Sequence, residues 1–226
     1  MSLALFAIAI APGLAIATYF YFRDKYDREP FKPLFVSFLL GAFMVIPAAL
    51  LEGILIGNAM EGNQSLLMSA VIAFVFVALV EEGLKYGVLK GYAFKHPAFN
   101  EPFDGIVYSV MVSMGFATLE NVFYVYGHGW GVGFLRMFTA VPMHAAVGVL
   151  MGYYVGKAKF SSAAPQIALK GLALATLFHG AYDFWLFQKW NQSLALLAFV
   201  VLAISLRLAK KSVREQVEDS PFKPHS

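Results

Sequence analysis

Six ionisable side chains interrupt long apolar stretches of the sequence, and their types suit acid–base chemistry. They are three glutamates, two histidines and an aspartate: Glu81, Glu82, Glu120, His144, His179 and Asp183. A charged side chain at the centre of a membrane helix costs about 2.5 to 3.5 kcal/mol on insertion scales, so each such residue requires an explanation. Carboxylates and imidazoles that meet inside a helix bundle can activate water for hydrolysis, with or without a metal ion.

The spacing of these residues places some of them on one helix face. Lys85 follows Glu81 by four positions and Glu82 by three, so its ammonium group can reach either carboxylate. One glutamate can therefore be neutralised while the other stays available as a base. His179 and Asp183 are also four positions apart, which allows the carboxylate to orient the imidazole.

The residues and motifs that the sequence lacks exclude several other chemistries. With no cysteine, the chain cannot form a disulfide scaffold, a thiolate metal site, a Cys nucleophile or a redox dithiol. The His-Glu-x-x-His zinc motif, the Gly-x-Ser-x-Gly nucleophile elbow and the Gly-x-Gly-Asp motif are absent. A proton-coupled transporter remains the alternative function, in which the same Glu, Lys, His and Asp groups form a relay at the membrane midplane.

Other polar and small residues have structural interpretations. Considered alone, His144 lies on an apolar helix face. A structural core histidine explains it as well as a functional histidine does. Glu52 lies near the end of its apolar stretch and is expected at the membrane interface. Glycines at every fourth position indicate close helix packing; the two series are Gly83, Gly87 and Gly91, and Gly148, Gly152 and Gly156.

The composition indicates the elements that must position these groups. Of the 226 residues, 59% are hydrophobic and 14% are charged, whereas a globular domain has about 45 to 50% and about 25%, respectively. The mean hydropathy is +0.66. These values predict an all-α fold, a polytopic membrane helix bundle.

About 20 apolar residues cross a hydrocarbon core about 30 Å thick, and seven stretches of that length can be drawn. They cover approximately residues 2–22, 33–57, 66–90, 103–126, 134–156, 167–187 and 193–208. The helical rise of about 1.5 Å per residue places Glu82 deeper in the membrane than Glu120, His144 and His179.

The basic residues predict the orientation of these seven spans. The connections on one side and the C-terminal segment hold 14 of the 17 Lys and Arg residues, which by the positive-inside rule places the N-terminus outside and the C-terminus in the cytoplasm. Residues 1–209 are therefore predicted to form one transmembrane catalytic domain, and residues 210–226 a basic cytoplasmic tail. The first span is expected to be retained, since basic residues follow it and do not precede it as in a signal peptide. These positions explain the net charge of +3 without a nucleic-acid partner.

Four motifs follow one another on successive predicted helices. They are Glu-Glu-Gly-Leu-Lys at 81–85, Phe-x-x-x-Glu-Asn at 116–121, His144, and His-Gly-Ala-Tyr-Asp-Phe at 179–184. Together they resemble the PrsW family of intramembrane proteases, relatives of the CAAX-processing and bacteriocin-processing proteases. The resemblance implies a bacterial inner-membrane endopeptidase that cuts a membrane-anchored protein, and the founding member of the family is known for cutting an anti-sigma factor.

The resemblance also implies roles for individual residues. Glu82, together with Glu81, would be the base that activates water. His179 would assist this step and carry the proton to the leaving amine. His144 and Asp183 would position the water or stabilise the oxyanion.

Glu120 occupies the position at which the CAAX-processing relatives have a histidine. The PrsW branch has a glutamate at this position, as this chain does. Because a carboxylate stabilises an oxyanion only when it is protonated or metal-bound, that role stays open for Glu120. Lys85 and Asn121 are expected to support the site. A divalent metal such as zinc is a candidate cofactor, although water activation by Glu without a firmly bound metal is favoured; its candidate ligands are Glu82, Glu120, His144 and His179. The expected partners are the lipid bilayer and a single-span membrane protein substrate.

Overall fold

The structure is a computed structural model that describes residues 3–57 and 65–224. Every regular element in these two ranges is a helix, which confirms the all-α prediction. The elements are α1 (Leu3–Arg23), α2 (Phe31–Phe43), α3 (Val45–Ile56), α4 (Leu66–Val71), η2 (Ile72–Ala78), α5 (Leu79–Gly91), η3 (Ala93–Lys95), α6 (Pro102–His128), α7 (Trp130–Phe138), α8 (Ala140–Lys159), α9 (Ala164–Phe187), η4 (Gln192–Leu196) and α10 (Leu197–Glu218).

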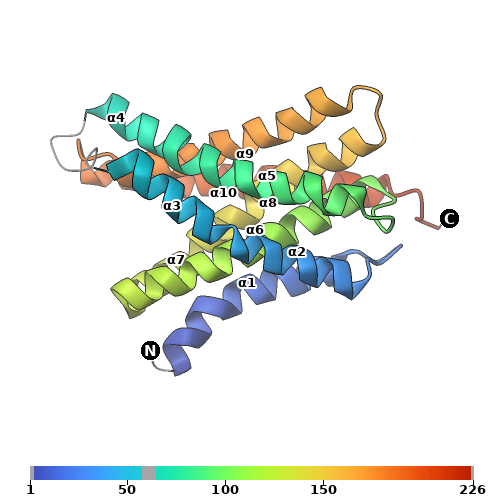
Figure 1. Cartoon of the computed structure of the whole chain (residues 1–226), viewed down its shortest axis with the longest axis horizontal. Helices are drawn as coiled ribbons and strands as arrows, with labels where there is room; N and C mark the ends of the chain where they lie inside the picture. The colour runs from blue at the N-terminus through green and yellow to red at the C-terminus, as the bar shows by residue number, and fades with distance from the viewer. Residues whose placement is uncertain (1–2, 58–64, 225–226) are drawn as a thin grey trace.

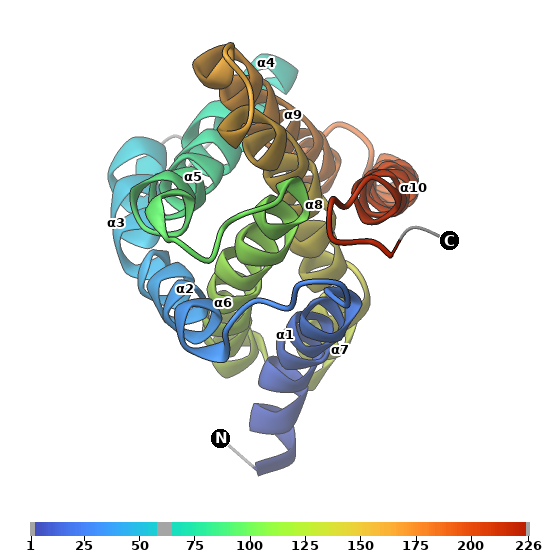
Figure 2. The same ribbon diagram turned by 90° about the vertical axis from the view of Figure 1, so that its right-hand side faces the viewer.

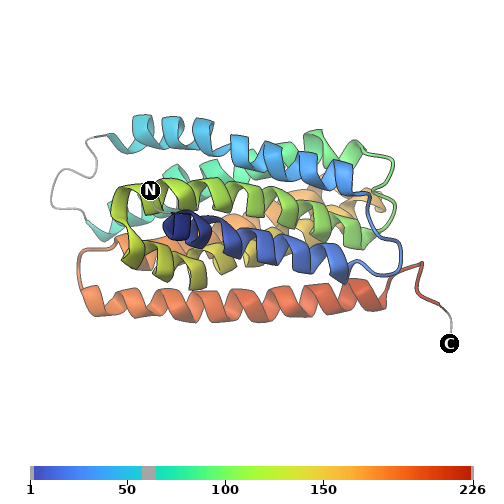
Figure 3. The same ribbon diagram turned by 90° about the horizontal axis from the view of Figure 1, so that it is seen from below.

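The long helices run roughly side by side in one bundle (Figures 1 and 3). Seen along the bundle, α6 and α8 lie toward the middle, and α1, α2, α3, α5, α9 and α10 surround them (Figure 2). All of α6 from Phe103 to Thr118 is buried, as is most of α8. The outer helices expose large apolar side chains, among them Phe22, Leu50 and Leu177. An apolar exterior of this extent suits contact with lipid.

Five helical stretches among the described residues are long and apolar enough to cross a membrane. One of them, Pro102–Lys159, is 58 residues long and contains three separate helices, α6, α7 and α8. The chain is therefore a multi-pass helical membrane protein. The count of seven spans and the orientation of the termini remain predictions.

The predicted span at 66–90 consists of three consecutive helical elements. Ser65 caps α4 by accepting a hydrogen bond from the backbone N–H of Met68 at 3.2 Å. The π-helical segment η2 follows, and α5 then begins at Leu79. A π-helix has more residues per turn than an α-helix, so η2 changes which side chains of the first turn of α5 face the bundle interior. Such π-helical segments are frequent at functional sites. Glu81 and Glu82 lie in that first turn.

The last helix is longer than the span predicted at 193–208. It continues to Glu218, so the predicted domain boundary at residues 209 and 210 falls inside α10. Val213 and Val217 are buried, and Gln216 donates a hydrogen bond to the backbone oxygen of Tyr153 at 3.0 Å. A prediction from hydropathy alone ends the span where Lys and Arg residues become frequent. The helix continues beyond that point because one apolar face of it is buried against the bundle.

The two glycine series behave differently. A Cβ atom on Gly152 would collide with the backbone of Gly105, and one on Gly156 would collide with the backbone of Pro102, so α6 and α8 pack closely as predicted. The prediction is wrong for the series Gly83, Gly87 and Gly91, because no neighbouring atom of the described residues lies within 4 Å of a Cβ built at any of the three.

Gly152→Ala is expected to destabilise the protein by about 1 to 3 kcal/mol, because the added methyl group forces α6 and α8 apart. Gly53→Ala is the matched control, since a Cβ on Gly53 in α3 meets nothing within 4 Å. The midpoint of thermal unfolding in detergent measures both variants. Equal midpoints would contradict the close α6–α8 packing.

Candidate active site

Lys85 lies at the centre of the polar cluster and is only 1% exposed. Its Nζ donates to Glu81 Oε2 at 3.0 Å and to Glu82 Oε1 at 2.7 Å. A third contact, of 3.1 Å, joins Nζ to Nδ1 of His144 on α8. An ammonium group has three N–H donors and no acceptor, so these contacts use all three and require Nδ1 of His144 to be the acceptor. Lys85 therefore joins both carboxylates to α8.

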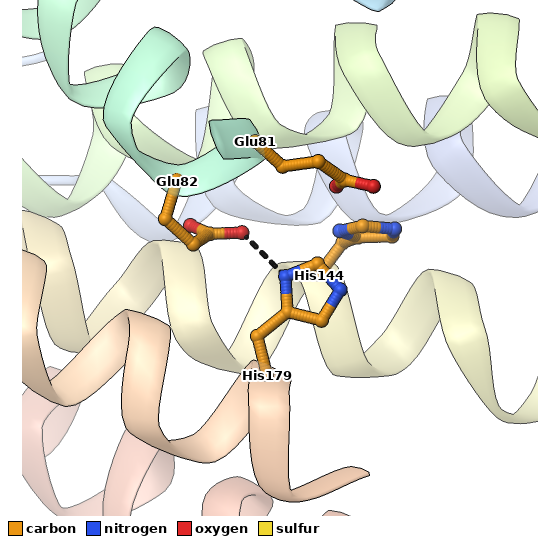
Figure 4. Close-up of side chains that lie close together, drawn as sticks. All are labelled: Glu81, Glu82, His144 and His179. Atoms are coloured by element: carbon orange, nitrogen blue, oxygen red, sulfur yellow. Dashed lines mark hydrogen bonds and ion pairs between the residues drawn. The ribbon is translucent and has the colours of Figure 1, made fainter. Parts of the chain in front are cut away.

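His179 connects α9 to the same cluster. Its Nδ1 lies 2.9 Å from Glu82 Oε1, the contact drawn in Figure 4, and its Nε2 lies 3.3 Å from Asp183 Oδ2. Because both ring nitrogens face carboxylate oxygens, both can donate only if the ring is the protonated imidazolium. The arrangement thus favours a His179 that carries a proton.

Three helices bring these side chains together in the bundle interior, where ionisable groups in apolar helices are expected to meet. Glu81 and Glu82 on α5, His144 on α8 and His179 on α9 point toward one another (Figure 4). The imidazole rings of His144 and His179 meet edge to face, with ring centroids 5.0 Å apart. The greater depth estimated for Glu82 does not separate it from the histidines, because η2 and the inclination of the helix alter the depth of a residue from the value that a straight upright helix gives.

Glu120 and Asn121 on α6 form a second layer with a residue that was not predicted. Arg136 Nη2 donates to Glu120 Oε2 at 2.6 Å, and Arg136 Nε donates to Asn121 Oδ1 at 3.1 Å. The same Glu120 oxygen lies 2.9 Å from His144 Nε2. The guanidinium group favours an ionised Glu120, which accepts hydrogen bonds and orients His144. This pairing makes Glu120 unsuitable as a donor to an oxyanion.

Asn121 and Arg136 also explain how the short helix α7 is positioned. Asn121 Nδ2 donates to the backbone oxygen of Ala9 on α1 at 3.0 Å, so α1, α6 and α7 meet at this amide. In the sequence, Arg136 is one of the three basic residues outside the 14 that mark the predicted cytoplasmic side. An isolated arginine within an apolar stretch was the signal for its role, because such a charge needs a partner.

A cavity of about 700 Å³ lies beside the cluster. Five of the six predicted site residues line it, and Glu82 alone does not: the five are Glu81, Glu120, His144, His179 and Asp183. Glu52 and Arg136 also line this cavity, so Glu52 lies beside the site. Because Glu82 is 0% exposed, it lies behind the layer of groups that a substrate can reach.

The donor atoms of this cluster fit a metal ion in type. Glu81, Glu82, His144 and His179 each offer one atom within 4.8 Å of the other three, and zinc accepts carboxylate and imidazole ligands. Glu82 Oε2 is buried with no hydrogen-bond partner among the described residues. Lys85 contacts three of these four side chains, so a metal ion would compete with its ammonium group. Glu120, a predicted ligand, lies outside this group of four.

Comparison with known proteins adds a family match. The model of a family described as PrsW family intramembrane metalloprotease matches residues 29–209, which include every predicted site residue. No solved structure matches the chain.

Several curated relatives match over nearly their whole length. Protease PrsW of Bacillus subtilis (strain 168) is 39% identical over 213 residues, which cover 92% of this chain and 95% of that protein. Protease PrsW of Geobacillus kaustophilus (strain HTA426) is 37% identical over 211 residues and 92% of both chains. Protease PrsW of Clostridioides difficile (strain 630) is 34% identical over 219 residues, 93% of this chain and 91% of that one.

Proposed function

Because this chain belongs to the PrsW family of intramembrane metalloproteases, we propose that the cluster around Lys85 hydrolyses a peptide bond of a membrane-anchored protein substrate. The chain is a protease and a multi-pass bacterial membrane protein. The observation that carries the proposal is the placement on one cavity of a carboxylate, Glu81, and an imidazole, His179, whose two nitrogens each face a carboxylate. A carboxylate base and an imidazolium acid can perform the two proton transfers of peptide hydrolysis by water.

Glu81 is the proposed general base, with Glu82 as its positioning neighbour. Glu81 lines the cavity, and only its Oε2 is held by Lys85, which leaves Oε1 to accept a hydrogen bond from water. Glu82 is fully buried and joins Lys85 to His179 through a single oxygen, Oε1. This division of roles refines the expectation from the family resemblance, in which Glu82 acts as the base together with Glu81.

His179 is the proposed general acid. Glu81 takes a proton from water while the water oxygen attacks the carbonyl carbon of the substrate. The His179 imidazolium then gives its proton to the amide nitrogen as the C–N bond breaks, which releases a carboxylic acid and an amine. Transfer of the Glu81 proton to His179, directly or through water, restores both groups. Glu82 keeps its hydrogen bond to Nδ1 through this cycle, while Nε2, which faces Asp183 at 3.3 Å, gives up the proton and takes it back.

Lys85 supplies a fixed positive charge to the cluster in this proposal. A zinc ion held by Glu81, Glu82, His144 and His179 would supply Lewis-acid polarisation of the carbonyl group. We favour water activation by Glu81 without a firmly bound metal, since the Lys85 ammonium group already contacts three of those four side chains.

Cleavage of a single-span substrate by the purified protein, with metal analysis and with or without chelator, tests the proposal. Metal-free activity that resists the chelator supports water activation by Glu81. Activity that the chelator removes and zinc restores contradicts the metal-free mechanism, although the protein would still be a protease. Proton or solute flux in liposomes without peptide cleavage would instead support the transporter alternative.

The proposed topology has seven crossings, with the N-terminus outside and the C-terminus in the cytoplasm. Three features support it: 14 of the 17 Lys and Arg residues lie in the connections of one predicted side and in the C-terminal segment, the short helix α7 lies between α6 and α8 in the chain, and α9 has 24 residues. The proposed substrate is a protein with a single membrane span, such as an anti-sigma factor. A helix of that protein would enter the cavity along its apolar walls, which include Val45, Phe116 and Phe199, and so reach Glu81 and His179.

Arg136→Gln is expected to lower kcat about 10- to 100-fold with little change in KM, because Glu120 loses its cation and no longer holds His144 in place. Arg136→Lys should recover part of the loss, since it keeps the charge but not the second hydrogen bond to Asn121. Lys189→Gln, outside the cluster, is the control for lost charge. Equal kcat values in the Gln and Lys variants would contradict this positioning role.

A further inference from the structure

A second polar cluster lies at the end of the bundle where the α1–α2 and α5–α6 connections and the C-terminus gather (Figures 1 and 3). Asp24, Glu101 and Asp104 each offer a carboxylate oxygen within 4.8 Å of the other two. All three are buried, with exposed fractions of 1%, 2% and 0%. They share no residue with the active site and have no part in the proposed peptide hydrolysis.

The carboxylates are held in place by neutral donors. Asp24 Oδ2 accepts from the backbone N–H of Glu29 at 2.8 Å. Asp104 Oδ2 accepts from the backbone N–H groups of Asn100 at 2.7 Å and Glu101 at 2.8 Å. The hydroxyl of Ser220, beyond the end of α10, donates to Glu101 Oε2 at 2.5 Å. These bonds fix the oxygens in position, and every donor is an uncharged group.

One carboxylate oxygen, Asp24 Oδ1, remains without a partner. It is buried and lacks a hydrogen bond within residues 3–57 and 65–224. Leaving such an ionised oxygen unpaired away from water costs several kcal/mol. Burial accordingly raises the pKa of Asp24 to about 6.

The nearby basic side chains are engaged elsewhere. Arg28 Nε donates to the backbone oxygen of Asp24 instead of its carboxylate. Lys159 Nζ donates to the backbone oxygen of Phe94 at 2.7 Å. A fourth buried carboxylate, Glu29, accepts from the hydroxyl of Tyr108, a neutral donor. Among the described residues, no Lys or Arg forms an ion pair with this cluster.

We propose that Asp24, Glu101 and Asp104 bind a hard divalent cation such as Mg²⁺ or Ca²⁺. The donors are oxygens from carboxylates that are already oriented, and these cations prefer such ligands at about 2.0 to 2.6 Å. A bound ion joins the α1–α2 connection to the start of α6, where Ser220 also connects the C-terminal segment. The site is therefore structural and differs in chemistry from the Glu–His cluster, whose imidazoles suit zinc.

The test is thermal unfolding of the purified full-length protein, stripped with a chelator and then given Mg²⁺ or Ca²⁺. At a cation concentration of about 100 times the dissociation constant, the midpoint should rise by about 5 to 10 °C. Asp24→Asn should remove most of this rise. Asp27→Asn is the matched control, because it removes the same charge from the same connection while Asp27 bonds outside the cluster, to Asn100.

Two further variants keep the outcome decisive. Glu101→Gln replaces Asp24→Asn if the latter does not fold, and it should also remove most of the rise. Glu82→Gln should retain the full rise, because that residue belongs to the active site. The proposal is overturned if the wild-type midpoint does not respond to either cation. It is equally overturned if Asp27→Asn loses as much of the rise as Asp24→Asn, or if Glu82→Gln alone loses it.

Discussion

Glu81→Gln is expected to lower the rate of peptide cleavage about 10³-fold, because the amide cannot take a proton from water. Glu82→Gln should also be severely impaired but should retain roughly ten times more activity than Glu81→Gln. The oxygen of its amide can still accept from Lys85 and His179, and only the charge is lost. Initial rates with a single-span substrate in detergent or liposomes measure both variants.

The order of the two effects decides which glutamate is the base. A Glu82→Gln variant that is less active than Glu81→Gln would reverse the assignment made from the cavity. Thermal unfolding of both variants is the necessary control, since either one changes the charges around Lys85. A rate loss that follows the loss of folded protein would have no bearing on the base.

Lys85→Met is expected to destabilise the protein by about 3 to 5 kcal/mol and to abolish cleavage. Removing one partner of a buried ionic group leaves the other charges uncompensated, and here two carboxylates and an imidazole lose their shared donor. The midpoint of thermal unfolding measures the effect. Lys90→Met is the matched control on the same helix, because Lys90 is partly exposed and forms no ion pair within the described residues.

A second substitution separates the stability effect from the catalytic one. Adding Glu82→Gln to Lys85→Met removes one unpaired carboxylate, so stability should partly return while cleavage stays absent. If Lys85→Met unfolds at the wild-type midpoint, Lys85 is not the residue that holds the cluster together.

The convergence of the site could be predicted from sequence because the membrane restricts where ionisable groups are placed. Glu81, His144 and His179 lie in apolar helices, and only the bundle interior offers them polar partners. The pairing of Lys85 with both glutamates followed from helical spacing alone. These inferences need no knowledge of how the helices are arranged.

Other features depend on tertiary packing that the pattern does not contain. Glu81 and Glu82 are adjacent in sequence, and the rotation of α5 after η2 decides which of them reaches the cavity. Arg136 was missed because residues 134–156 were expected to form one span, whereas the chain ends α7 at Phe138 and begins α8 at Ala140. Glu52 was placed at an interface because its depth alone does not reveal the cavity beside it.

The most direct test of the central claim is to map the products formed from a single-span membrane protein by the purified wild-type chain and by His179→Ala. Mass spectrometry identifies the new chain ends. The proposed acid–base pair predicts one amide bond cut within or beside the membrane span by the wild type, and no products from a folded His179→Ala variant. An intact substrate with the wild-type protein, or equal cleavage by both proteins, would contradict it.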